Sequence, residues 1–187
     1  MLKKDKTMRN LITKISALFL LGILLISCSN QQSLQEYYVD NQENNNFIMI
    51  DVPTSLISDD TQALDAEQKK VLKTLKKINL MAYPIKEETA ANYDTEVAKV
   101  NTILAGDDYE QLMKMNSDEG GMKLYFKGEE EAIDEVIVFA SEDSKGFMLA
   151  RVLGDDMNIN DMFSLMQSIE EGDIDVSQFE GIMDVFK

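Results

Sequence analysis

Few side chains in this sequence could do covalent or acid–base chemistry. Cys28 is the only cysteine in 187 residues, and the chain contains no histidine and no tryptophan. Catalysis by Ser–His or Cys–His pairs, zinc sites built from His and Cys, haem ligation through either residue and disulfides within the chain are therefore excluded. An enzyme with this sequence would have to rely on carboxylates, lysine, tyrosine or an oxygen-ligated metal. We therefore expect a protein that is not an enzyme and that holds no cofactor.

The segment before Cys28 is typical of a secretory signal peptide. Residues 1–14 carry five basic residues and one acid, and the apolar run 15–26 is shorter than the roughly 20 residues that span a bilayer. Residues 25–28, Leu-Ile-Ser-Cys, resemble the lipobox of bacterial lipoproteins. That resemblance implies cleavage between Ser27 and Cys28, lipidation of the Cys28 thiol, and membrane anchoring to which each buried methylene contributes about 0.8 kcal/mol.

This interpretation divides the chain into three parts. Residues 1–27 are the signal peptide, residues 28–32 are a polar tether that could extend to residue 46, and residues 33–187 form a single domain. Both Met1 and Met8 are plausible translation starts. Ser29 is not the aspartate that retains some lipoproteins in the inner membrane, and "SNQQS" lacks the acidic cluster of surface-exported lipoproteins. We expect a lipid anchor in the outer membrane, with the domain on the periplasmic face rather than on the cell surface.

The charge of the chain restricts its partners. Its formal net charge is −16, and removing residues 1–27 leaves 13 Lys and Arg against 33 Asp and Glu. A field of this sign repels nucleic acid and anionic lipid head groups, so neither is expected as a partner. A basic envelope protein would suit the charge.

The hydrophobic pattern predicts an α+β fold with a mixed or antiparallel sheet and helices packed mainly on one face. A capping box of Ser33 and Glu36 marks the first helix, Asn160 or Asp161 is expected to cap a late helix, and Ser177 begins the last one. Helices are predicted over residues 33–39, 63–78, 92–106, 108–116, 158–172 and 177–186. Strands are predicted over residues 47–52, 78–85, 122–128, 132–143 and 146–154, the last three as a C-terminal meander.

Two acidic segments have the spacing of calcium ligands. Asp156, Asn158 and Asn160 match the first three ligand positions of an EF-hand loop, and Asp173 and Asp175 repeat the start of that pattern. Both segments lack the glycine that the loop requires at its sixth position. They are weak calcium candidates, and the starts of capped helices are the preferred interpretation, with no metal.

Clustered acids raise a second possibility. Residues 129–131 and residues 107–108 could supply the paired carboxylates that hydrolyse glycosidic bonds. Close pairs of acids arise by chance in a chain this acidic, so a solvated surface is the preferred interpretation.

Several apolar segments together resemble a known family. They are "FIMIDVPTSLIS", "LKKINLMAYPI" and the stretch from residue 107 to residue 166, following the lipobox and the "SLQEYY" helix. These segments resemble the DUF4252 family, small lipoproteins of Bacteroidota whose function is uncharacterised. The resemblance implies no catalytic residues, and the frequent position of such genes beside those for extracytoplasmic-function sigma factors implies a role in envelope signalling.

The sequence thus favours a lipid-anchored envelope protein that binds or signals to a protein or peptide partner. A carboxylate-dependent glycan hydrolase and a purely structural envelope component are the alternatives.

Overall fold

A computed structural model of the chain describes residues 31–53 and 66–170. The predicted signal peptide, Cys28 and the predicted helix from residue 177 lie outside the described residues. Within them, the helices are α2 (Leu34–Asp40), α4 (Ala66–Thr74), the short 3₁₀ helix η1 (Ala90–Asn92), α5 (Tyr93–Leu104) and α6 (Ile159–Glu170). The strands are β1 (Ile48–Pro53), β2 (Leu75–Pro84), β3 (Glu110–Ser117), β4 (Gly120–Glu129), β5 (Ala132–Glu142) and β6 (Gly146–Met157).

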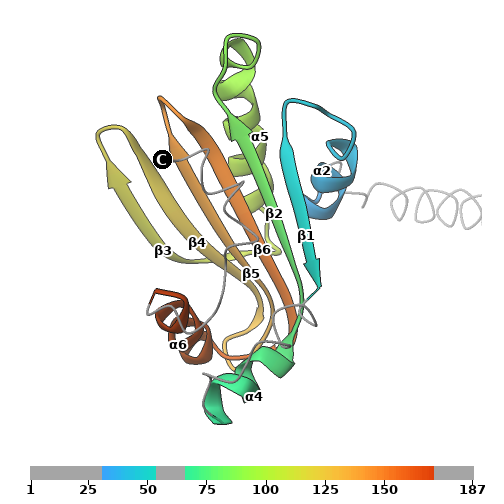
Figure 1. Cartoon of the computed structure of the whole chain (residues 1–187), viewed down its shortest axis with the longest axis vertical. Coiled ribbons are helices and arrows are strands. Elements are labelled where there is room, and N and C mark those ends of the chain that lie inside the picture. The colour runs from blue at the N-terminus through green and yellow to red at the C-terminus, as the bar shows by residue number, and fades with distance from the viewer. Residues whose placement is uncertain (1–30, 54–65, 171–187) are drawn as a thin grey trace, which may run out of the picture. The chain divides into compact units, whose positions relative to one another are not determined.

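The six strands form one antiparallel sheet in the order β1-β2-β6-β5-β4-β3 (Figure 1). This confirms the predicted α+β class and selects the antiparallel alternative over the mixed one. Strands β3 to β6 follow one another as a meander, which therefore has four strands rather than the three that the sequence predicted. β6 then lies beside β2, which joins the meander to the β1–β2 pair.

The helix predicted over residues 108–116 is wrong, because β3 occupies most of that segment. β3 pairs with β4 across a turn at Asp118 and Glu119, with Met113 opposite Leu124 and Met115 opposite Met122. The residues of this segment have no strong preference for a strand, but pairing satisfies backbone groups along the edge of β4 from Gly120 to Phe126. Tertiary pairing therefore outweighs the local propensity.

The helix predicted over residues 63–78 is too long. α4 ends at Thr74, so Leu75 and Ile78, which fall within the predicted helix, lie in β2. β2 pairs with β1 on one side and with β6 on the other. Pairing with β6 from Leu75 onward and with β1 from Lys77 onward stabilises the extended backbone of β2, whereas Val71 and Leu72 are buried residues of α4.

Helices cover both faces of the sheet. On one face, α2 and α5 pack over a core that includes Tyr37, Tyr83, Phe139 and Phe147. Alternate residues of the same strands point to the opposite face, where α4 and α6 pack at one end of the sheet, visible at the bottom of Figure 1. The expectation of helices mainly on one face thus describes α2 and α5 but not α4 and α6. No helix in the described ranges is long and apolar enough to cross a membrane.

The first helix forms for the local reason that the sequence indicated. The Ser33 hydroxyl accepts a hydrogen bond from the Glu36 backbone N–H at 3.2 Å, and the Glu36 carboxylate accepts one from the Ser33 backbone N–H at 2.7 Å. This capping box satisfies donors that the first turn leaves unpaired. It begins α2 at Leu34 and places Leu34, Tyr37 and Tyr38 against the sheet.

Gly146, at the start of β6, supports a first prediction. Its φ is 127°, and a Cβ at this position would lie 2.0 Å from the Tyr83 carbonyl oxygen. Gly146→Ala should therefore lower the free energy of unfolding by about 2 kcal/mol or more, measured by urea denaturation. Asp143→Ala, in the same exposed turn, should change it by less than about 0.5 kcal/mol. Equal free energies of unfolding of the two variants would contradict the conclusion that position 146 requires glycine.

Candidate functional site

Two opposite charges are buried on the face of the sheet that α2 covers. Arg151 Nε on β6 donates to Glu135 Oε1 on β5 at 2.6 Å, and Arg151 Nη2 donates to Glu135 Oε2 at 3.1 Å. The side chains of Arg151 and Glu135 are only 9% and 6% exposed. The Tyr109 hydroxyl donates to Glu135 Oε1, which also accepts from Arg151 Nε, at 3.4 Å. This two-point geometry fixes both groups in place.

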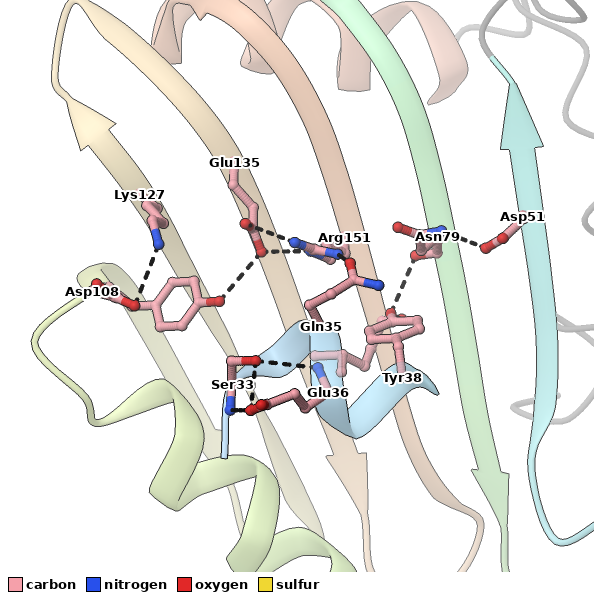
Figure 2. Close-up of polar contacts among 12 residues, drawn as sticks. Ser33, Gln35, Glu36, Tyr38, Asp51, Asn79, Asp108, Lys127, Glu135 and Arg151 are labelled. Carbon is pink, nitrogen blue, oxygen red and sulfur yellow. Dashed lines mark hydrogen bonds and ion pairs between the residues drawn. The ribbon is translucent and has the colours of Figure 1, made fainter. Parts of the chain in front are cut away.

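Helix α2 is attached to this charge pair. Gln35 Oε1 accepts a hydrogen bond from Arg151 Nη1 (Figure 2). The Tyr38 hydroxyl donates to the Leu149 carbonyl oxygen at 3.0 Å, and the Tyr37 hydroxyl donates to Glu96 Oε2 of α5 at 2.8 Å. Three polar contacts therefore hold α2 in one position over β6 and beside α5.

The ionisable groups around the pair keep their usual neutral-pH states. Burial acts to lower the pKa of Arg151, but its hydrogen bonds to Glu135 and the negative charge of that carboxylate outweigh burial, so the pKa is raised. Burial also raises the pKa of Tyr38, and burial together with the charge of Glu135 raises the pKa of Tyr109. Arg151 stays protonated and both phenols stay neutral, so these groups offer no proton transfer near pH 7.

A second polar group lies beside the first, toward the edge of the sheet. Asp51 of β1 stands opposite Asn79 of β2, which in turn stands opposite Arg151. The Asp51 carboxylate accepts hydrogen bonds from Asn79 Nδ2 and, at 2.7 Å, from Lys77 Nζ. Burial acts to raise the pKa of Asp51, but these two hydrogen bonds and the Lys77 charge prevail and lower it. Asp51 is therefore ionised at neutral pH.

A pocket of about 390 Å³ opens between α2, β1 and β2. Its lining combines charged, amide and apolar side chains, namely Gln35, Tyr38, Gln42, Met49, Asp51, Lys77, Asn79 and Leu153. The volume lies within the roughly 300–1,000 Å³ range of small-ligand sites. Tyr38, the one aromatic residue among the described residues of the lining, is 4% exposed, so it offers almost no ring face to a ligand.

Two amides of the lining, each held by one hydrogen bond, have one further atom without a partner among the described residues. Asn79 uses its Nδ2 on Asp51, and its side-chain oxygen accepts no hydrogen bond. Gln35 uses its oxygen on Arg151, and its amide nitrogen donates none. In Figure 2 that Gln35 nitrogen lies on the side of the amide group that faces Asn79. A hydrogen-bond donor and an acceptor are thus both available to a ligand in the pocket.

Comparison with known proteins identifies the family. A family model described as a domain of unknown function, DUF4252, matches residues 37–165, more than half of the chain. The chain belongs to the DUF4252 family. No curated protein and no solved structure matches it. The matched residues of the DUF4252 domain include most of the pocket lining.

The calcium candidates that the structure describes, Asp156, Asn158 and Asn160, are not among the residues that line the pocket of the DUF4252 domain. Asp156 is exposed near the end of β6, and the Asn158 side-chain oxygen accepts a hydrogen bond from the Asn160 backbone N–H at 2.8 Å. Asn158 therefore precedes and caps α6, whereas the sequence favoured Asn160 or Asp161 for that role. The described residues contain no group of three or more metal-ligating His, Cys, Asp or Glu side chains. Ser27, Cys28, Asp173 and Asp175 lie outside the described residues.

The clustered acids of the sequence are also separate from the pocket lining. Residues 129–131 are exposed at the turn between β4 and β5, and residues 107–108 are exposed after α5. Asp108 forms an ion pair with Lys127 at 3.3 Å. These acids occupy solvated positions of the DUF4252 domain, as the preferred interpretation of the sequence had it.

Sequence analysis did not identify the residues of the pocket or of the buried pair. A signal for the pair existed, because every second residue of a strand points to the same face of the sheet. Arg151 therefore shares a face with the apolar Phe147 and Leu149. Glu135 likewise shares a face with Ile137 and Phe139. Opposite charges at core positions of consecutive strands indicate a buried ion pair. Asn79 and Gln35 carry no comparable signal, since their meeting depends on the register of β2 with β6 and on the docking of α2.

The buried pair gives a second prediction. Arg151→Met leaves the Glu135 carboxylate buried without its cation, so the free energy of unfolding should fall by about 3–5 kcal/mol in urea denaturation. The double variant Arg151→Met/Glu135→Met should recover at least half of that loss. Lys76→Met, which removes an exposed ion pair with Asp155, should cost less than about 1 kcal/mol. Simple additivity of the two core substitutions would argue against a coupled pair.

Proposed function

We propose that this DUF4252 protein is a lipid-anchored envelope module that binds a protein or peptide partner and catalyses no reaction. The observation that carries the proposal is the pocket beside α2, where the charged lining residues Asp51 and Lys77 are paired with each other. The unpaired lining groups are neutral amides. Amides recognise polar ligand groups by hydrogen bonding but do not exchange protons near pH 7.

The state of Asp51 supports binding over catalysis. A carboxylic acid that donates a proton to a leaving group needs a raised pKa. The pKa of Asp51 is lowered by its bonds to Lys77 and Asn79. This acid therefore suits the role of a fixed negative charge that attracts a cation.

The short sequence separation between Cys28 and Gln35 of the pocket lining supports a role at the membrane. Gln35 lies seven residues after Cys28, and a fully extended chain of that length spans at most about 25 Å. A lipid on Cys28 would hold a bound partner close to the bilayer, which we propose to be the outer membrane on its periplasmic face. The net charge of −16 favours a basic partner and disfavours nucleic acid.

The anchor is tested on the cysteine itself. Cells that express the full chain should incorporate an alkyne-labelled palmitate analogue into it, and Cys28→Ala should abolish the label and leave the precursor uncleaved, as seen by gel mobility. The thiol is the only group in the lipobox-like segment that can accept a thioether-linked lipid. Incorporation into Cys28→Ala, or processing at the same site, would refute lipidation at this residue.

The binding role is tested by crosslinking in native membranes. Gln42 lines the pocket, is exposed, and forms no side-chain hydrogen bond within the described chain, so a photocrosslinking amino acid should be tolerated there. We expect one reproducible protein adduct from this position. The matched control places the same amino acid at Glu130, exposed on the β4–β5 turn, and should not give that adduct. No adduct, or identical adducts at both positions, would contradict the proposed role.

A further inference from the structure

We propose that the pocket beside α2 binds an extended peptide segment: its main-chain amides pair with Gln35 and Asn79, and a basic side chain pairs with Asp51. This inference rests on the proposed function and specifies the class of ligand. It begins from one unpartnered atom on each of two lining amides that are held by a hydrogen bond, the amide nitrogen of Gln35 and the side-chain oxygen of Asn79. A donor and an acceptor within one pocket complement the C=O and N–H groups of a polypeptide main chain.

Both recognition atoms are held in fixed orientations. Asn79 is only 5% exposed, and its hydrogen bond to Asp51 directs the opposite atom of the amide, the oxygen, away from Asp51. The bond from Arg151 fixes the Gln35 oxygen in the same way, which leaves the nitrogen free to donate (Figure 2). Side chains fixed before binding lose little entropy when a ligand arrives, so weak polar contacts can still contribute affinity.

The charges at the mouth of the pocket favour a cationic ligand. The side chains of Lys77 and Asp51 are 43% and 52% exposed, and solvent weakens an ion pair this exposed. A ligand cation can therefore displace Lys77 from Asp51 at little cost. A ligand carboxylate on Lys77 would lie beside Asp51 and within the negative field of a chain with net charge −16. Peptides with Lys or Arg should consequently bind more tightly than acidic peptides.

The lining is less suited to a saccharide. A saccharide is amphipathic and gains affinity by packing on the face of an aromatic ring. Here the Tyr38 ring is buried, and its hydroxyl donates to the Leu149 carbonyl oxygen at 3.0 Å. Its ring is thus packed between α2 and the sheet. What remains open in the lining consists of amide groups, one ion pair and the partly buried Met49 and Leu153.

The inference is tested by NMR titration of the full ¹⁵N-labelled chain in detergent micelles. The probe is the tripeptide Ac-Gly-Lys-Gly-NH₂, compared with Ac-Gly-Glu-Gly-NH₂, with the fully N-methylated lysine peptide, and with chitobiose. We expect saturable shifts of the side-chain amide signals of Gln35 and Asn79 with the lysine peptide. Affinity should fall at least tenfold for the glutamate and N-methylated peptides. Equal affinity for the lysine and glutamate peptides, no saturable shift, or tighter binding of chitobiose would overturn the inference.

Two neighbouring lysines provide matched variants. Lys77→Ala frees Asp51 from its cation and should tighten binding of the lysine peptide about threefold or more. Lys76→Ala removes the same charge from the adjacent residue, whose ion pair is with Asp155, and should leave affinity unchanged. Asp51→Asn keeps the size of the side chain and should weaken binding at least fivefold. If the two lysine variants changed affinity equally, the overall charge of the chain would explain the preference for the lysine peptide, and the role of Asp51 would be overturned.

The titration and the crosslinking experiment can fail separately. A membrane partner captured at position 42, combined with no peptide binding, would retain the proposed function and overturn the peptide assignment. Peptide binding that follows the variants, with no membrane partner captured, would retain the assignment and overturn the proposed function.

Discussion

The buried pair of Arg151 and Glu135 is the constraint on which the arrangement of α2 and the pocket depends. An arginine taken out of water is costly unless its donors are satisfied, and here Glu135 and Gln35 accept from it. Because Gln35 belongs to α2, the same guanidinium that neutralises Glu135 also fixes the helix over β6. The requirement to satisfy one buried charge thus sets the position of a helix and the orientation of an amide in the pocket.

The two faces of the sheet differ in the kinds of residue that they bury. The face under α4 and α6 holds an apolar cluster at one end, which includes Phe126, Ile133 and Met157. The face under α2 and α5 holds an aromatic core, in which Phe47, Tyr83 and Phe147 contact one another. Beside that core lies a row of polar side chains, which Figure 2 shows: Asp51, Asn79, Arg151 and Glu135. Polar residues at the border of a packed core can be fixed by neighbours and still reach a ligand, which neither a core interior nor an open surface allows.

Local signals in the sequence predicted the parts of the fold that local interactions determine. Ser33 and Glu36 are three residues apart, so their capping box could be identified from sequence and it begins α2 as predicted. β3 is set by pairing with β4 across the turn at Asp118 and Glu119, and the early start of β2 is set by pairing with β6, which is distant in sequence. The pattern of residues within each segment does not contain that information. The site is harder still, because Asn79, Asp51 and Gln35 come from three elements whose registers must all be known.

The dependence of the pocket on α2 also links binding to the fold of the N-terminal region. α2 has seven residues, too few for a helix to be stable alone in water. Its stability therefore comes from the capping box, from the burial of Leu34, Tyr37 and Tyr38, and from the bond between Gln35 and Arg151. Three of the lining residues, Gln35, Tyr38 and Gln42, lie on α2 or just after it, so the pocket exists only while α2 is docked. If a lipid on Cys28 holds the chain a few residues upstream, the element that joins the anchor to the domain is the one that completes the binding site.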